Sequence, residues 1–187
     1  ESGDSEIKIE PYDKTNEKFS FNFEGKSING NLNITRTFSH LSTMPLKLKT
    51  DLNLYFEQTD KFDLIERLAN VTLSFLRFVT YRRNIVFNNL ILMKKFEDTN
   101  KYHKVGTLFI NGFEKERTED EKIVQNHLLD FPIIEDNLGK LFENLADEKI
   151  YLTHIPENSK DNNRITPARF IMVTAGFEWQ FRSTYNE

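Results

Sequence analysis

Apolar residues recur at every second position in the first part of the chain, which is the spacing of β-strands. Two such runs flank Gly25-Lys26, with apolar side chains at Phe19, Phe21, Phe23, Ile28, Leu32 and Ile34. The pattern predicts a β-hairpin that turns at Gly25-Lys26. Asn29-Gly30 is the competing turn, but Gly30 is in phase with the apolar positions. We therefore expect a bulge or a close backbone approach at Gly30, inside the second strand.

The segment LKLKTDLNLYFE, residues 46–57, continues the alternation. One side of this predicted strand is apolar and carries Leu46, Leu48, Leu52, Leu54 and Phe56. The other side is polar and carries Lys49, Asp51, Asn53, Tyr55 and Glu57. A period of two with one wet face is typical of an antiparallel sheet.

The spacing changes to three and four from Phe62 to about Arg82. Apolar residues fall at Leu64, Ile65, Leu68, Val71, Phe75, Phe78 and Val79. These positions draw a broad stripe along one side of a helix, for which Asp60 is the candidate N-cap. We expect this helix to lie on a sheet.

The second half of the chain predicts a second hairpin and two further helices. Residues 84–97 and 103–112 have strand character and can pair, whereas the charged run 114–122 predicts a solvated loop. A short helix is indicated by Leu138, Leu141, Phe142 and Leu145. Residues 157–163, ENSKDNN, contain turn formers and no apolar residue, so they predict a flexible linker.

The order of these elements favours an α+β fold. Several strands, one long helix, further strands and two helices lack the regular alternation that a parallel sheet needs. We expect a mainly antiparallel, β-sandwich-like sheet with the long helix packed on it and a C-terminal helix. The predicted division is a β-rich recognition domain over residues 1–163 and a helix over 164–187.

The C-terminal helix begins at Thr166-Pro167, where the threonine hydroxyl can cap the helix and proline suits its first position. Apolar residues then cover most of its circumference, and such a helix needs partners on more than one side. We expect Phe170, Val173 and Phe177 to hold it to this domain. Trp179 and Phe181 are then the predicted contacts to a further domain.

Composition excludes several classes of function. The 187 residues contain no cysteine, which excludes a disulfide framework, a thiolate metal site and a cysteine nucleophile. The net charge is −4, with 25 basic and 29 acidic residues mixed along the chain, so we expect no direct binding of nucleic acid. The sequence has no apolar span long enough for a membrane and no signal peptide, which favours a cytoplasmic location. It begins with Glu1, which we interpret as a fragment boundary.

No catalytic motif stands out. The seven glycines form no phosphate-binding loop, and the histidines at 40, 103, 127 and 154 lack metal-ligand spacing. Arg36 and His40 lie at the end of a predicted strand rather than on a shared helix, so they do not form a ribonuclease pair. We therefore expect no enzymatic activity, metal or cofactor in this chain.

One outward row has the residue types of a ligand face. Asp51, Tyr55 and Glu57 project from the same side of the third strand, and carboxylates beside an aromatic ring can hold or cleave a sugar. A solvated strand face has the same pattern. The row therefore stands as a candidate, and it favours a carbohydrate-binding or carbohydrate-processing module as the alternative function.

The order of elements resembles one known family. The helix DLIERLANVTLSFLRFVTYRRN, the later segment FPIIEDNLGKLFENL and the closing RITPARFIMVTAGFEWQF are similar to the N-terminal region of ApeA-type bacterial anti-phage proteins. In that family a β-rich domain precedes a C-terminal HEPN ribonuclease domain. The resemblance implies a non-catalytic recognition or regulatory domain that controls a downstream HEPN ribonuclease. Its partners would be its own C-terminal domain and a phage component.

Overall fold

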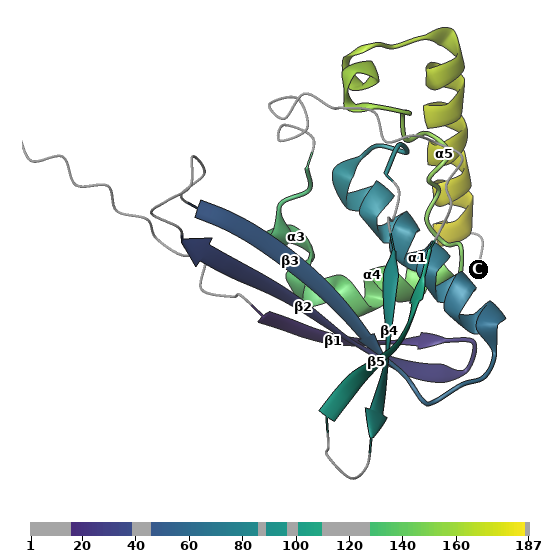
Figure 1. The fold of residues 1–187 in the computed structure, drawn as a ribbon. Helices are drawn as coiled ribbons and strands as arrows, with labels where there is room; N and C mark the ends of the chain where they lie inside the picture. The colour runs from purple at the N-terminus through teal and green to yellow at the C-terminus, as the bar shows by residue number, and fades with distance from the viewer. Residues whose placement is uncertain (1–15, 39–45, 86–88, 97–100, 110–127, 186–187) are drawn as a thin grey trace, which may run out of the picture. The chain divides into compact units, whose positions relative to one another are not determined.

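The computed structural model describes residues 16–38, 46–85, 89–96, 101–109 and 128–185 (Figure 1). The chain forms two compact units, one up to Phe56 and the other from Glu57 onward. Antiparallel strands and helices follow one another in the order of an α+β protein, as the sequence predicts. The predicted loop over residues 114–122 lies outside the described residues.

The first unit contains one antiparallel sheet in the order β1-β2-β3. Its strands are β1 (Asn16–Phe23), β2 (Lys26–Phe38) and β3 (Leu46–Tyr55). The three predicted strands are therefore confirmed. Stacking of this sheet into a β-sandwich stays a prediction.

The turn between β1 and β2 lies one residue earlier than predicted. Phe23 pairs with Lys26, so Glu24 and Gly25 form the two-residue loop. Both have positive φ, 51° and 74°, as the tight turn that matches the twist of a hairpin requires. Lys26 therefore belongs to the strand.

One face of this sheet is apolar because side chains opposite each other across the strands point the same way. Phe21 lies opposite Ile28, and Leu32 lies opposite its β3 partner Leu52. The most buried members of this face are Phe21, Phe23, Ile28 and Leu32. Gly30 lies opposite Phe19, and a Cβ at Gly30 would collide with the Phe19 ring, which confirms a close approach at this glycine.

The second unit is built around α1 (Phe62–Thr80) and α4 (Leu138–Ala146). Phe75 of α1 stacks on Phe142 of α4 with ring centroids 4.7 Å apart. The buried residues of the two helices are Leu64, Leu68, Ala69, Val71, Thr72, Phe75, Leu138, Phe142 and Leu145. Both predicted helices are confirmed, and packing of α1 on a sheet stays a prediction.

The N-terminus of α1 is not capped by Asp60. The N-cap position is Lys61, which makes no capping hydrogen bond through its side chain. Its backbone N–H instead donates to the Thr59 hydroxyl over 3.1 Å. The helix ends at Thr80, two residues before the predicted end at about Arg82, and the C-cap residue Tyr81 has a left-handed φ of 49°.

Two shorter parts of the second unit lie between α1 and α4 in the chain. A brief turn of helix, α3 (Phe131–Ile134) and η1 (Glu135–Asn137), leads into α4. The hairpin of β4 (Leu90–Phe96) and β5 (Lys101–Leu108) is antiparallel, as predicted, with a register shift between Leu92 and Met93.

The predicted flexible linker is ordered. Residues Ser159–Asn163 form the 3-10 helix η2. The Asn158 side chain accepts hydrogen bonds from the backbone N–H groups of Lys160 and Asp161, and Ser159 is fully buried. Turn-forming residues here build a capped helical turn, so the linker prediction is wrong.

The C-terminal helix α5 spans Pro167–Tyr185. Its predicted start is confirmed, because the Arg169 N–H donates to the Thr166 hydroxyl over 3.2 Å. The Arg169 guanidinium also donates to the backbone carbonyls of Asp161 and Arg164. These bonds join η2 to α5. The two compact units divide between residues 56 and 57, and the division into domains at residues 163 and 164 stays a prediction.

Candidate functional site

The outward face of the sheet β1-β2-β3 is polar along all three strands. Three cross-strand rows lie next to one another: Asn16, Asn33 and Asp51; Lys18, Asn31 and Asn53; Ser20, Asn29 and Tyr55. We call these nine residues the polar sheet face. Amide, carboxylate and hydroxyl groups with one aromatic ring can donate and accept hydrogen bonds to a polar ligand.

The predicted ligand row is only partly assembled on this face. Asp51 and Tyr55 belong to it, and Asp51 forms an ion pair of 2.6 Å with Lys49. Glu57 follows the end of β3 and belongs to the second compact unit. At the centre of the face, the Asn31 side-chain oxygen is buried and accepts no hydrogen bond from the described residues.

The second unit contains a row of four aromatic rings that leads from the end of α1 to α5. Tyr81 contacts His154 at 5.7 Å, His154 stacks on Tyr151 at 5.9 Å, and Tyr151 contacts Trp179 at 6.1 Å between ring centroids. A backbone hydrogen bond also joins the segment after α1 to the segment after His154. The Arg83 N–H donates to the carbonyl of Pro156 over 2.9 Å. The row therefore connects three parts of the chain through packed rings.

Helix α5 packs against Tyr151 at Gly176. A Cβ at Gly176 would lie 2.5 Å from Cδ1 of Tyr151, so a larger residue would push the helix away from that ring. Gly176 is also the one buried residue among those of α5. The side of α5 that contains Gly176 and Trp179 is thus the side that faces its own unit.

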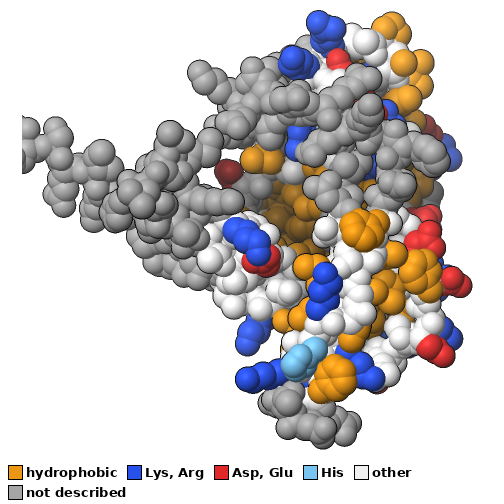
Figure 2. Space-filling view, in the orientation of Figure 1, with side chains coloured by type: hydrophobic (Ala, Val, Ile, Leu, Met, Phe, Trp, Pro, Cys, Tyr) orange, Lys and Arg blue, Asp and Glu red, His pale blue; other side chains and the backbone are white. Residues whose placement is uncertain are grey.

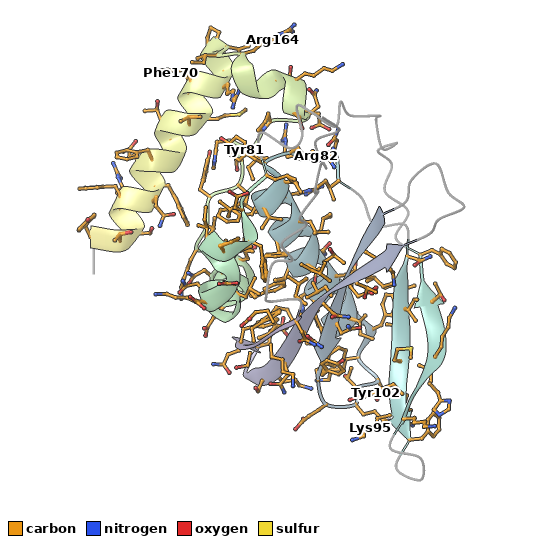
Figure 3. All side chains as sticks on the ribbon, turned by 90° about the vertical axis from the view of Figure 1, so that its left-hand side faces the viewer. Tyr81, Arg82, Lys95, Tyr102, Arg164 and Phe170 are labelled. Atoms are coloured by element: carbon orange, nitrogen blue, oxygen red, sulfur yellow. The ribbon has the colours of Figure 1, made fainter. Side chains whose placement is uncertain are left out.

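The opposite side of α5 carries an aromatic stripe. Separations of three, four and seven residues place side chains on one side of a helix. We call this set the outward stripe, and its members are Phe170, Val173, Phe177, Phe181 and Tyr185. All are exposed, Phe177 most of all at 76%. Figure 3 shows Phe170 near the start of α5 and away from Tyr81.

The assignment of Phe170, Val173 and Phe177 to the docked side is therefore wrong. Both sides of α5 are apolar, and close approach at Gly176 decides which side packs. Trp179 is 36% exposed and turns toward Tyr151, whereas Phe181 is exposed and contacts Tyr185 at 4.8 Å. The predicted contact pair is split between the two sides of the helix.

Polar groups beside the outward stripe are matched within the helix. The hydroxyls of Thr174 and Thr184 donate to the carbonyls of Phe170 and Gln180, over 2.9 and 2.8 Å. Glu178 and Arg182 form an ion pair of 2.5 Å one turn apart. The stripe is consequently an apolar surface beside which these two hydroxyls and this ion pair are already matched.

His154 is held in its neutral form by its surroundings. Burial lowers its pKa from the ordinary 6.5; a hydrogen bond to the Tyr151 backbone acts in the opposite direction, and the positive charge of Arg169 lowers it further. The folded protein therefore binds this proton more weakly than the unfolded chain does. Stability from this site is complete above about pH 6.5 and falls as the pH drops below that value.

We expect the protein to lose stability in acid, because His154 in the aromatic row then gains a proton. The midpoint of thermal unfolding, followed by Trp179 fluorescence, is expected to fall between about pH 7 and pH 5. In His154→Gln the fall over this range is expected to be smaller, because no imidazole gains a proton. An equal fall in both proteins would show that His154 does not contribute to the pH dependence.

The described residues contain no cluster of three or more His, Asp or Glu side chains that could hold a metal ion. His103 lies on β5 and His154 in the aromatic row, while His40 and His127 are outside the described residues. Within the part of the chain that the structure describes, no helix has the length and apolar content to cross a bilayer.

Comparisons with protein-family models, with characterised proteins and with solved structures found no match to this chain. The site residues are therefore interpreted from their own geometry. Sequence reasoning missed Tyr151, His154 and Gly176, which position α5. The only available signal was a glycine in the middle of an otherwise bulky helix, since such a glycine often permits close packing.

Proposed function

We propose that this chain is a non-catalytic recognition and regulatory domain of a cytoplasmic bacterial anti-phage defence protein. It would respond to a phage component and control a HEPN ribonuclease domain of the same protein. The observation that carries the proposal is the outward stripe of α5. The resemblance in element order supplies the identity of the partner, a bundle of helices.

The outward stripe has the properties of an interface. Large exposed apolar patches usually mark sites of interaction. The stripe runs from Phe170 to Tyr185, a length of about 22 Å at 1.5 Å per residue. A rigid helix of that length can pack its aromatic side chains into the groove between two partner helices. Its matched flanking charges favour an apolar partner over a charged one.

The contacts of α5 also give it a means of regulation. Arg169 joins it to η2, and Tyr151 joins it through the aromatic row to Tyr81 at the end of α1. A partner that displaced any of these contacts would alter the position of α5. Recognition elsewhere on the second unit can in this way change how the outward stripe meets the nuclease.

The test is a phage-protection assay with the complete protein. Phe177→Ser is expected to abolish protection, because it places a hydroxyl in the centre of the interface. The same change is expected to alter the stability of residues 1–187 by less than about 0.5 kcal/mol, as surface substitutions do. Ile171→Ser is the matched control, since Ile171 is 65% exposed on the same helix but lies about 100° around it from Phe170. Full protection by Phe177→Ser, or equal loss in both variants, would contradict the proposal.

A carbohydrate-binding module is the second candidate. It is favoured by the polar sheet face, where Tyr55 and the buried Asn31 oxygen could meet a sugar ring and its hydroxyls. It has less support than the regulatory function. Glu57 lies outside the strand, and Asp51 is already paired with Lys49.

A further inference from the structure

The outer half of the β4-β5 hairpin is exposed on both faces. Every described residue from Met93 to Phe96 and from Lys101 to Val105 is solvent-exposed. Figures 1 and 3 show this half of the hairpin extending away from α1 and α4, the helical core of the same unit. A two-stranded hairpin has only marginal stability by itself in water. A ligand that packed on this exposed part of the hairpin would stabilise it.

The side chains of this arm are basic and aromatic. The two described strands carry four lysines, Lys94, Lys95, Lys101 and Lys104, and no Asp or Glu. Figure 2 shows basic, histidine and apolar side chains interleaved over the hairpin. The intervening residues 97–100 add Glu97 and Asp98 in the sequence, so the formal charge of the whole hairpin is still positive.

The pairing of β4 with β5 places lysines and aromatic rings on both faces of the hairpin. On one face Lys94 lies opposite His103 and Phe96 lies opposite Lys101. The Lys94 ammonium is 5.6 Å from the centre of the Phe96 ring, and the edge-to-face contact of Phe96 with His103 measures 5.4 Å between centroids.

The other face has the same composition. Lys95 lies opposite Tyr102, and Met93 lies opposite Lys104. Figure 3 shows Lys95 and Tyr102 together on the outer half of the hairpin. Each face therefore presents at least one aromatic ring beside two lysines.

We propose that the β4-β5 hairpin binds single-stranded nucleic acid. The lysines would neutralise phosphates, and Phe96 and Tyr102, which are 43% and 47% exposed, would stack on unpaired bases. Stacking requires an accessible base face, so a paired duplex satisfies only the lysines. An anionic membrane would likewise pair with the lysines, but it has no flat base on which the aromatic rings could stack.

This inference changes the expectation that the chain does not bind nucleic acid. That expectation averaged charge over 187 residues, whereas the hairpin concentrates four lysines in two short strands. The inference does not depend on the proposed regulatory function. A protection assay that contradicted the role of the outward stripe would therefore not contradict nucleic-acid binding by the hairpin.

The test is fluorescence anisotropy of the full chain with labelled oligonucleotides of about ten nucleotides. The probes are oligouridylate, oligodeoxyuridylate, which differs from it in the sugar alone, and a duplex of the same length. At about 50 mM salt the chain is expected to bind both single strands more tightly than the duplex. A preference for one of the two single strands assigns the ligand to RNA or to DNA. Equal binding shows that the hairpin does not distinguish the two sugars. Each of these outcomes supports the proposal.

Lys95→Gln with Lys104→Gln tests the charge. The double variant is expected to weaken binding at least about tenfold and to reduce the slope of log affinity against log salt by about 1.4. The matched control is Lys140→Gln with Lys160→Gln, which removes two exposed lysines outside the hairpin and is expected to change affinity less than about twofold.

Tyr102 tests the stacking. Tyr102→Leu is expected to weaken binding at least about fivefold, and Tyr102→Phe, which keeps the ring, to stay within about twofold. The inference is wrong if the wild-type chain shows no binding up to roughly 100 µM. It is also wrong if the duplex binds as tightly as the single strands, or if the control lysines matter as much as those of the hairpin. Circular dichroism verifies that each variant keeps its fold.

Discussion

Phe142→Ala is expected to lower the free energy of unfolding of the second unit by about 3–5 kcal/mol. The Phe142 side chain is fully buried on α4 and stacks on Phe75 of α1 at 4.7 Å. Truncation removes the transfer free energy of the ring and leaves a cavity that two packed helices cannot close. Loss of the aromatic pair adds to the effect.

Urea unfolding followed by Trp179 fluorescence measures this change, because Trp179 is the single tryptophan of the chain and lies in the second unit. Phe177→Ala is the control. It removes the same ring from a site that is 76% exposed, and is expected to change stability by less than about 0.5 kcal/mol. A loss in Phe142→Ala as small as that expected for Phe177→Ala would show that Phe142 is not a core residue.

Gly30→Ala is expected to destabilise the first unit by about 1–3 kcal/mol. Propensity alone predicts the opposite sign, since alanine in a strand interior is favoured over glycine by about 0.5–1 kcal/mol. The steric argument dominates because the Phe19 ring lies directly over Gly30, where a methyl group would have to be placed.

A double-mutant cycle with Phe19→Ala separates the two effects. Removing the ring makes room for the methyl group, so Gly30→Ala is expected to be neutral or stabilising in that background. Far-ultraviolet circular dichroism during urea unfolding reports the sheet. If Gly30→Ala destabilised equally with and without Phe19, contact with this ring would not be the cause.

Periodicity predicted most of the elements because each buries one side only. The strands β1, β2 and β3 alternate apolar and polar residues, and α1 and α4 repeat apolar residues every three or four positions. Both patterns follow directly from the geometry of the backbone. The α+β class was therefore predictable without any catalytic motif.

The errors concern local choices that periodicity does not determine. Glu24 adopts a positive φ of 51°, which its side chain does not favour, and this moved the β1-β2 turn by one residue. In the 157–163 segment, polar residues form a capped turn around buried Ser159. Composition alone treats such residues as solvated.

The candidate sites were predicted less well than the fold. Periodicity cannot determine which side of α5 packs when both sides are apolar, and Gly176 against Tyr151 decided it. The β4-β5 hairpin was predicted, but its candidate binding faces were missed for a different reason. Its lysines and aromatic rings alternate faces in register, and that arrangement becomes visible only after the strands are paired.

The regulatory proposal is tested most directly by binding between residues 1–187 and the proposed HEPN ribonuclease domain, produced separately. Isothermal titration calorimetry is expected to show binding with a negative heat-capacity change, because the outward stripe buries apolar surface. Phe177→Ser is expected to abolish that binding, whereas Ile171→Ser retains it. Absence of binding by the wild-type chain, or equal binding by Phe177→Ser, would contradict the account.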